Sequence, residues 1–103
     1  MSQYDFLKFV SNLMNVPEET IASFMPKGES RRKLTTAFRI SIAPSTHEMP
    51  VSFEEALSLY LIVRVLRPKY VVETGVSAGR SSAFILCGLC DNGEGELYSI
   101  DPN

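Results

Sequence analysis

Apolar positions in the first third of the chain recur at helical spacing. The stripe that predicts a first helix consists of Phe6, Val10, Leu13 and Met14, widened by Leu7 and Phe9. A break follows at residues 15–19, where Pro17 is predicted at the first position of a second, short helix and two acids suit its positive end. Residues 26–28 end that helix, and residues 29–39 are predicted to form a third.

The second half of the chain has a sharper pattern. Ser52 and Glu55 fit a capping box, in which each side chain satisfies a backbone N–H group at the start of a helix. The helix predicted over residues 53–66 is apolar nearly all round, so we expect it to be well buried. It ends before Pro68, because the residue preceding a proline disfavours helical backbone. Residues 41–50, with two prolines and no clear period, are predicted to be a loop.

Two short strands flank one further helix. The pattern predicts a buried strand at 70–72, a helix at 81–90, a polar loop at 91–95 and a second strand at 97–100. Strands joined by a crossover helix lie parallel, with a right-handed connection. The predicted fold class is therefore α/β, with an N-terminal helical segment in residues 1–50 and a βαβ unit in residues 51–103.

Composition narrows the function classes. Of 103 residues, 45% are hydrophobic and 21% are charged, with a formal net charge of −2. These values fit one folded domain and give no reason to expect nucleic acid or an anionic membrane as partner. The first residues lack the basic start of a secretory signal, and the apolar stretch 56–66 is too short to span a bilayer. Two cysteines make no disulfide framework, so we expect a reducing, cytoplasmic location.

Candidate chemistry gathers where the first predicted strand ends. In open α/β sheets, ligands bind outside the carboxyl ends of the strands, and Glu73 and Asp101 stand at two such ends. Between them, Gly75 and Gly79 permit a tight turn and close approach of a ligand. The following helix offers free N–H groups and a partial positive charge, beside the hydroxyl of Ser81. Such a site suits a ribose together with a small anionic group.

A dinucleotide site and a smaller nucleoside site both remain open on these grounds. The dinucleotide fingerprint G-x-G-x-x-G, started at Gly75, requires glycine at positions 77 and 80. The sequence has Ser77 and Arg80 there, and their side chains obstruct the close approach that a pyrophosphate needs. The spacing therefore disfavours a nicotinamide cofactor.

The segment Val71-Val72-Glu73-Thr74-Gly75-Val76-Ser77-Ala78-Gly79-Arg80-Ser81-Ser82 resembles the first motif of class I S-adenosylmethionine-dependent methyltransferases. It looks closest to the branch of catechol-type small-molecule O-methyltransferases, of which the helix ending at residues 65–69 is also typical. Residues 98–103 resemble the second motif of this family.

The resemblance implies a set of cofactor-binding residues for S-adenosyl-L-methionine. Glu73 would lie near the methionine amino group, Ser81 would help hold the carboxylate, and Asp101 would bind the ribose hydroxyls. Gly75 and Gly79 would shape the turn beneath the donor, with Ser77 at a middle position where this branch tolerates a departure from glycine. No catalytic residue and no metal ligand is assigned by these motifs.

The family resemblance also implies a Rossmann-like parallel sheet that is larger than two strands. Residues 51–103 would then be the first half of a donor-binding domain, apparently truncated, and inactive alone. The acceptor would be a small molecule or sugar. Two rivals remain: an NAD(P)-binding oxidoreductase fragment, and a non-catalytic assembly fragment in which a homo-oligomer or another chain completes the sheet.

Other candidate residues receive structural interpretations. Cys87 and Cys90 form a C-x-x-C pair late in a predicted helix, which favours packing in the core over redox or metal chemistry. His47 is expected to be solvated in its loop, and the basic cluster at 31–33 to be a solvated helix face. The four tyrosines, Tyr4, Tyr60, Tyr70 and Tyr98, are predicted to pack in the core as amphipathic residues.

Overall fold

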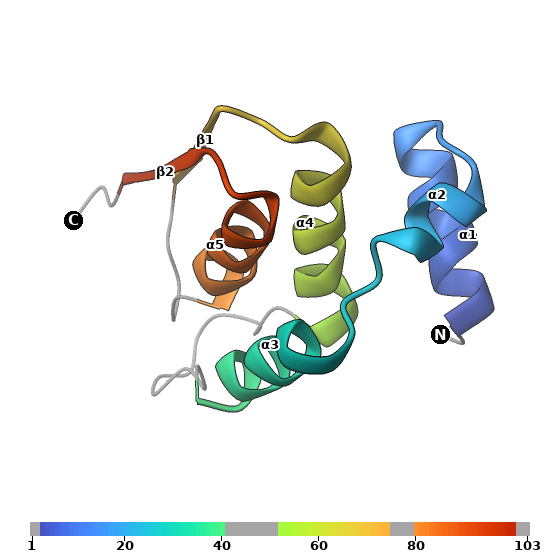
Figure 1. Ribbon diagram of the computed structural model, residues 1–103, viewed down its shortest axis with the longest axis horizontal. Helices are drawn as coiled ribbons and strands as arrows, with labels where there is room; N and C mark the ends of the chain where they lie inside the picture. Colours follow the sequence, from blue (N-terminus) through green and yellow to red (C-terminus); the bar gives the residue numbers. More distant parts are fainter. Residues whose placement is uncertain (1–2, 41–51, 75–79, 101–103) are drawn as a thin grey trace.

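The computed structural model describes residues 3–40, 52–74 and 80–100 of the chain. The elements in chain order are α1 (Gln3–Met14), α2 (Glu18–Ser23), α3 (Gly28–Ile40), α4 (Phe53–Leu66), β1 (Tyr70–Thr74), α5 (Arg80–Asn92) and β2 (Glu96–Ile100). The protein is thus mixed helix and strand, mostly helical, as the predicted α/β class requires in outline (Figure 1). The predicted loop at 41–50, with His47, lies outside the described residues.

Three N-terminal helices form as predicted, but α2 ends earlier, at Ser23, α3 already begins at Gly28, and Pro17 has a different role. This residue is the N-cap of α2 and not its first helical residue, because its backbone is extended, with φ −60° and ψ 148°. The apolar stripe of α1 is wider than the surface on which it packs. Phe6 and Val10 are buried, whereas Phe9 and Leu13 are 50% and 59% exposed.

Helix α4 begins and ends as its sequence predicts. The Ser52 hydroxyl accepts a hydrogen bond from the Glu55 N–H (3.1 Å), and the Ser52 N–H donates to the Glu55 carboxylate (3.2 Å). At the other end, Arg67 takes the left-handed conformation, and its N–H bonds to the Val63 carbonyl. Five side chains of α4 are buried: Ala56, Leu57, Tyr60, Leu61 and Val63.

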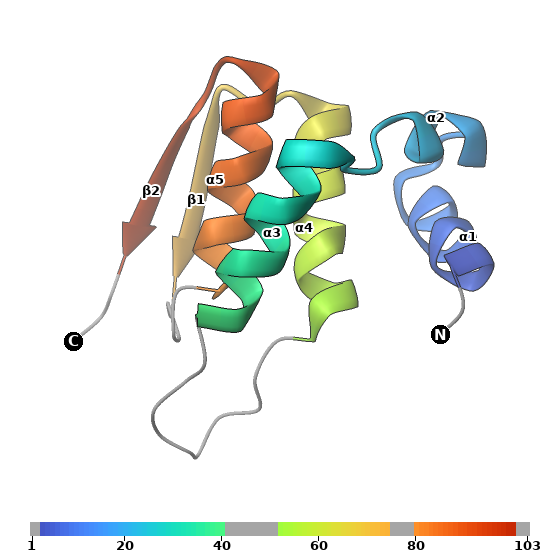
Figure 2. The same cartoon turned by 60° about the horizontal axis from the view of Figure 1, so that its bottom comes forward.

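The two strands pair in parallel, with Tyr70 opposite Glu96 and Thr74 opposite Ile100. The helices lie on one side of this sheet (Figure 2). On that side, Val71 of β1 and Leu97 of β2 pack against a buried cluster of α4 and α5 side chains. On the other face, four apolar side chains are more than half exposed, namely Tyr70, Val72, Tyr98 and Ile100. The prediction of a buried strand is therefore wrong for β1, because the described residues cover only one face of the sheet. The predicted core role is also wrong for Tyr70 and Tyr98.

One apolar core draws on both halves of the chain. Phe6, Val10, Ile21 and Leu34 from the first three helices pack with side chains of α4 and with Phe84 of α5. Edge-to-face ring contacts connect Phe38 to Phe53 (5.3 Å between centroids) and Phe53 to Phe84 (5.7 Å), joining α3, α4 and α5. Gly88 allows α4 and α5 to approach closely, since a Cβ there would lie 2.9 Å from Val63 Cγ1. Across the described ranges, no helix is long and apolar enough to cross a membrane.

Candidate functional site

The candidate site lies at the carboxyl end of the sheet. Of its predicted residues, the structure describes Glu73 on β1 and Ser81 at the second position of α5. Gly75, Ser77, Gly79 and Asp101 lie outside the described residues. Because β1 and β2 are parallel and in register, both strands end at the same edge, and α5 starts near that edge (Figure 2).

Glu73 is the centre of a hydrogen-bonded cluster that joins three elements. The Ser99 hydroxyl of β2 donates to Glu73 Oε1 over 2.8 Å, and the Ser82 hydroxyl of α5 donates to the same oxygen. Ser99 is the register partner of Glu73, so the two side chains extend from neighbouring strands on the face that α5 covers. The carboxylate is half-buried and fixed between the strand ends and the first turn of the helix.

Among the described residues, this cluster uses only one oxygen of the Glu73 carboxylate. Both donors engage Oε1, and no described residue donates a hydrogen bond to Oε2. Its partners are neutral hydroxyls, and within the described ranges the ion pairs are Arg32–Glu29 and Arg67–Glu94, neither of which involves Glu73. The positive end of α5 supports the negative charge from one side. A ligand ammonium group would complement the remaining oxygen.

Ser82 and Ser99 belong to the cluster although the sequence analysis assigned them no role. The motif placed the serine of interest at Ser81, whereas the hydroxyl that reaches Glu73 comes from Ser82. A signal for Ser99 was available, because it stands one residue before the end of β2 as Glu73 does in β1. Equal distance from the strand ends predicts adjacency once the strands are taken as parallel and flush.

The C-x-x-C pair only partly matches its prediction. Cys87 is half-buried, and burial, followed by the nearby charge of Asp91, raises the pKa of its thiol, which disfavours the reactive thiolate. Cys90 is exposed, so its predicted place in the core is wrong. Both thiols border a hollow of about 230 Å³ between α3 and α5. No three potential metal-binding side chains come together in the part of the chain that the structure describes.

A second polar cluster lies at the far end of α5 from Glu73. Asp91 accepts hydrogen bonds from the hydroxyls of Tyr60 (2.7 Å) and Ser30 (2.8 Å). Asn92 accepts from Arg64 (2.9 Å) and donates to the Val63 carbonyl (2.9 Å). The predicted loop at 91–95 therefore begins too early, since α5 continues through Asn92.

The contacts of this second cluster point to a structural role. They join α3, α4 and α5, and burial, then the hydrogen bond to Asp91, raises the pKa of Tyr60 above its ordinary value. Every fully buried side-chain nitrogen or oxygen among the described residues has a hydrogen-bond partner. A network satisfied in this way stabilises the packing of the three helices.

No protein-family model, curated protein or solved structure matches the chain. Function is therefore inferred from the chain's own residues.

The predicted solvated face on α3 is confirmed, since Arg31, Arg32 and Lys33 are exposed.

Proposed function

We propose that this chain carries the donor-binding residues of a Rossmann-like, S-adenosyl-L-methionine-dependent methyltransferase. The observation that supports the proposal most directly is the Glu73 cluster, which holds a carboxylate at the common carboxyl edge of two parallel strands, beside the start of a helix. That edge is where open α/β sheets bind their ligands. The sequence motif that contains Glu73 is the reason for proposing S-adenosyl-L-methionine as the ligand.

The polar groups of the site fit the methionine end of this cofactor. Oε2 of Glu73, without a donor among the described residues, suits the ammonium group of the methionine moiety. The start of α5, with Ser81, suits the carboxylate, because helix N-termini attract anions. When bound, the cofactor would supply an electrophilic methyl group on sulfur, and the residues of this chain would bind and orient it.

The acceptor that we propose is a small molecule or sugar, methylated on oxygen. The free thiols of Cys87 and Cys90 favour a reducing compartment, such as the cytoplasm, for the protein.

A titration of the chain with S-adenosylhomocysteine, followed by backbone amide NMR shifts, tests the donor site. We expect saturable shifts at Glu73, Ser82 and Ser99. Glu73→Gln keeps an acceptor oxygen but removes the charge, so affinity should fall by about tenfold, the equivalent of one charge-assisted hydrogen bond. Glu19→Gln, which alters an exposed acid on α2, serves as the charge-matched control and should bind as the unmodified chain does.

Two results would contradict the donor assignment. One is NADH binding at the same edge with no response to S-adenosylhomocysteine, which would favour the oxidoreductase. The other is an equal affinity of Glu73→Gln and Glu19→Gln, which would separate Glu73 from any bound ligand.

An assembly function is the second candidate, because the outer face of the sheet exposes Tyr70, Val72, Tyr98 and Ile100. Exposed apolar patches of this kind often mark protein interfaces. Sedimentation velocity discriminates between the two candidates, since assembly through this face predicts a concentration-dependent dimer. A folded monomer at all concentrations would exclude self-assembly.

A further inference from the structure

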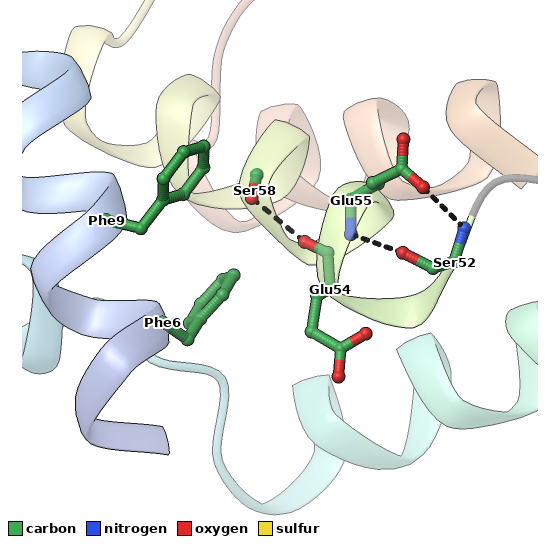
Figure 3. A pocket seen from close by; sticks show the side chains of 6 residues that line it. All are labelled: Phe6, Phe9, Ser52, Glu54, Glu55 and Ser58. Carbon is green, nitrogen blue, oxygen red and sulfur yellow. Dashed lines mark hydrogen bonds between the residues drawn. The ribbon is translucent and has the colours of Figure 1, made fainter. Parts of the chain in front are cut away.

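A second concave site lies between α1 and the first two turns of α4. Its volume is about 280 Å³, and its lining consists of Phe6, Phe9, Ser52, Glu54, Glu55 and Ser58. Figure 3 shows the two phenyl rings extending from α1 toward α4, with Ser58 and Glu54 nearer to them than Ser52 and Glu55. Helix α4 stands between this hollow and α5, so the hollow is separate from the Glu73 cluster (Figure 1).

The aromatic wall of the hollow is open to a ligand. Phe9 is 50% exposed although it is a large apolar residue, and Phe6 beside it is buried and fixed in the core. Two other phenylalanines of the chain already carry a cation, with Arg31 5.4 Å from the Phe53 ring centroid and Arg64 5.0 Å from that of Phe24. Within the described residues, no arginine or lysine lies over the Phe9 ring.

The polar wall offers mainly hydrogen-bond acceptors. The Ser58 hydroxyl donates its one hydrogen to the Glu54 backbone carbonyl (2.9 Å), so toward a ligand its oxygen can only accept. The Glu55 carboxylate is engaged in the cap of α4, whereas the exposed Glu54 carboxylate receives no hydrogen bond from the described residues (Figure 3). Among the described residues of the lining, the Ser52 hydroxyl is the one donor that remains, and none is a lysine or arginine.

We propose that this hollow binds a small organic ammonium ion with an apolar tail. The tail would lie against Phe6 and Phe9, and the charged nitrogen would donate to Glu54 and Ser58. An ammonium group has three donors and no acceptor, which matches a wall made of acceptors with two carboxylates. It is also attracted to the face of an aromatic ring. The volume, near the lower limit of small-molecule pockets, suits a compact ligand.

Phenethylammonium tests this proposal, with its neutral analogue 2-phenylethanol as the matched control ligand. Titrations followed by side-chain NMR of Phe6 and Phe9 should give a dissociation constant of about 1 mM for the ammonium ion. The alcohol should bind about tenfold more weakly, because it lacks both the ion pair and the cation–π attraction. Glu54→Gln and Phe9→Leu should each lower the affinity for the ammonium ion by about threefold.

Glu19→Gln and Leu13→Ala are the matched control variants, since one removes an exposed acid and the other an exposed apolar side chain outside the hollow. Both should leave the affinity unchanged. Equal binding of the alcohol and the ammonium ion would overturn the proposal, because it would show an apolar groove without cation selectivity. Absence of ring shifts, or affinity unaffected by Glu54→Gln, would overturn it as well.

Discussion

Replacing Phe84 with alanine should leave much of the chain unfolded at room temperature. Phe84 is fully buried, belongs to the main core, and makes an edge-to-face contact with Phe53, through which α5 is joined to α4. Truncation of a buried phenylalanine costs about 3–5 kcal/mol, because the ring leaves a cavity that its neighbours fill only in part. The free energy of unfolding of whole domains is about 5–15 kcal/mol, and the small core of this chain places its value toward the low end.

Urea unfolding followed by circular dichroism measures this loss. Phe9→Ala is the matched control, since it removes the same ring from a position that is 50% exposed, and it should cost about 1 kcal/mol. A Phe84→Ala chain with the urea midpoint of the Phe9→Ala chain would show that α5 does not depend on this core.

Local chemistry made helix α4 predictable to the residue. Its capping box, Ser52 with Glu55, uses groups three positions apart, and Pro68 blocks continuation two residues after the helix ends. Each of these effects acts between near neighbours in the sequence, so no knowledge of the remaining fold is needed. The parallel pairing of β1 and β2 was predictable for a similar reason, because the intervening segment has the length and pattern of a crossover helix.

The errors arise where distant partners decide the structure. Asp91 and Asn92 favour loops by composition, yet hydrogen bonds from Ser30, Tyr60 and Arg64 hold them in the last turn of α5. The apolar run at 70–72 suggested a strand buried on both faces, whereas the described residues cover only one face of the sheet. Burial depends on what packs against an element, which its own sequence does not contain.

The candidate site divides in the same way. Glu73 follows from the motif and from the rule that ligands bind at carboxyl strand ends. Its partners Ser82 and Ser99 depend on the strand register and on how α5 sits against the sheet. The aromatic hollow between α1 and α4 could not be predicted, because Phe6 and Phe9 belong to an ordinary amphipathic stripe until Glu54 and Ser58 are placed opposite them.

Gly95→Ala should destabilise the fold by about 3–5 kcal/mol, combining backbone strain with overpacking. Gly95 has a φ of +105°, a backbone angle that residues with a Cβ rarely adopt. A Cβ added there would lie 2.7 Å from the Pro68 carbonyl oxygen. It would also lie 2.5 Å from Leu89 Cδ2 in a buried cluster. Relief requires movement of backbone next to Lys69, whose carbonyl accepts the first hydrogen bond of β2 from Glu96 (2.9 Å).

The neighbouring turn provides a control for the strain alone. Gly93 also has a positive φ, +75°, but a Cβ there would meet nothing within 4 Å. Gly93→Ala should therefore cost only about 1–2 kcal/mol, the penalty of left-handed backbone for an L-residue. Thermal unfolding of the two variants separates the contributions, and amide exchange at Glu96 should rise only in Gly95→Ala. Equal melting temperatures would show that the Pro68 and Leu89 contacts yield without cost, and that close packing at Gly95 does not hold β2 against β1.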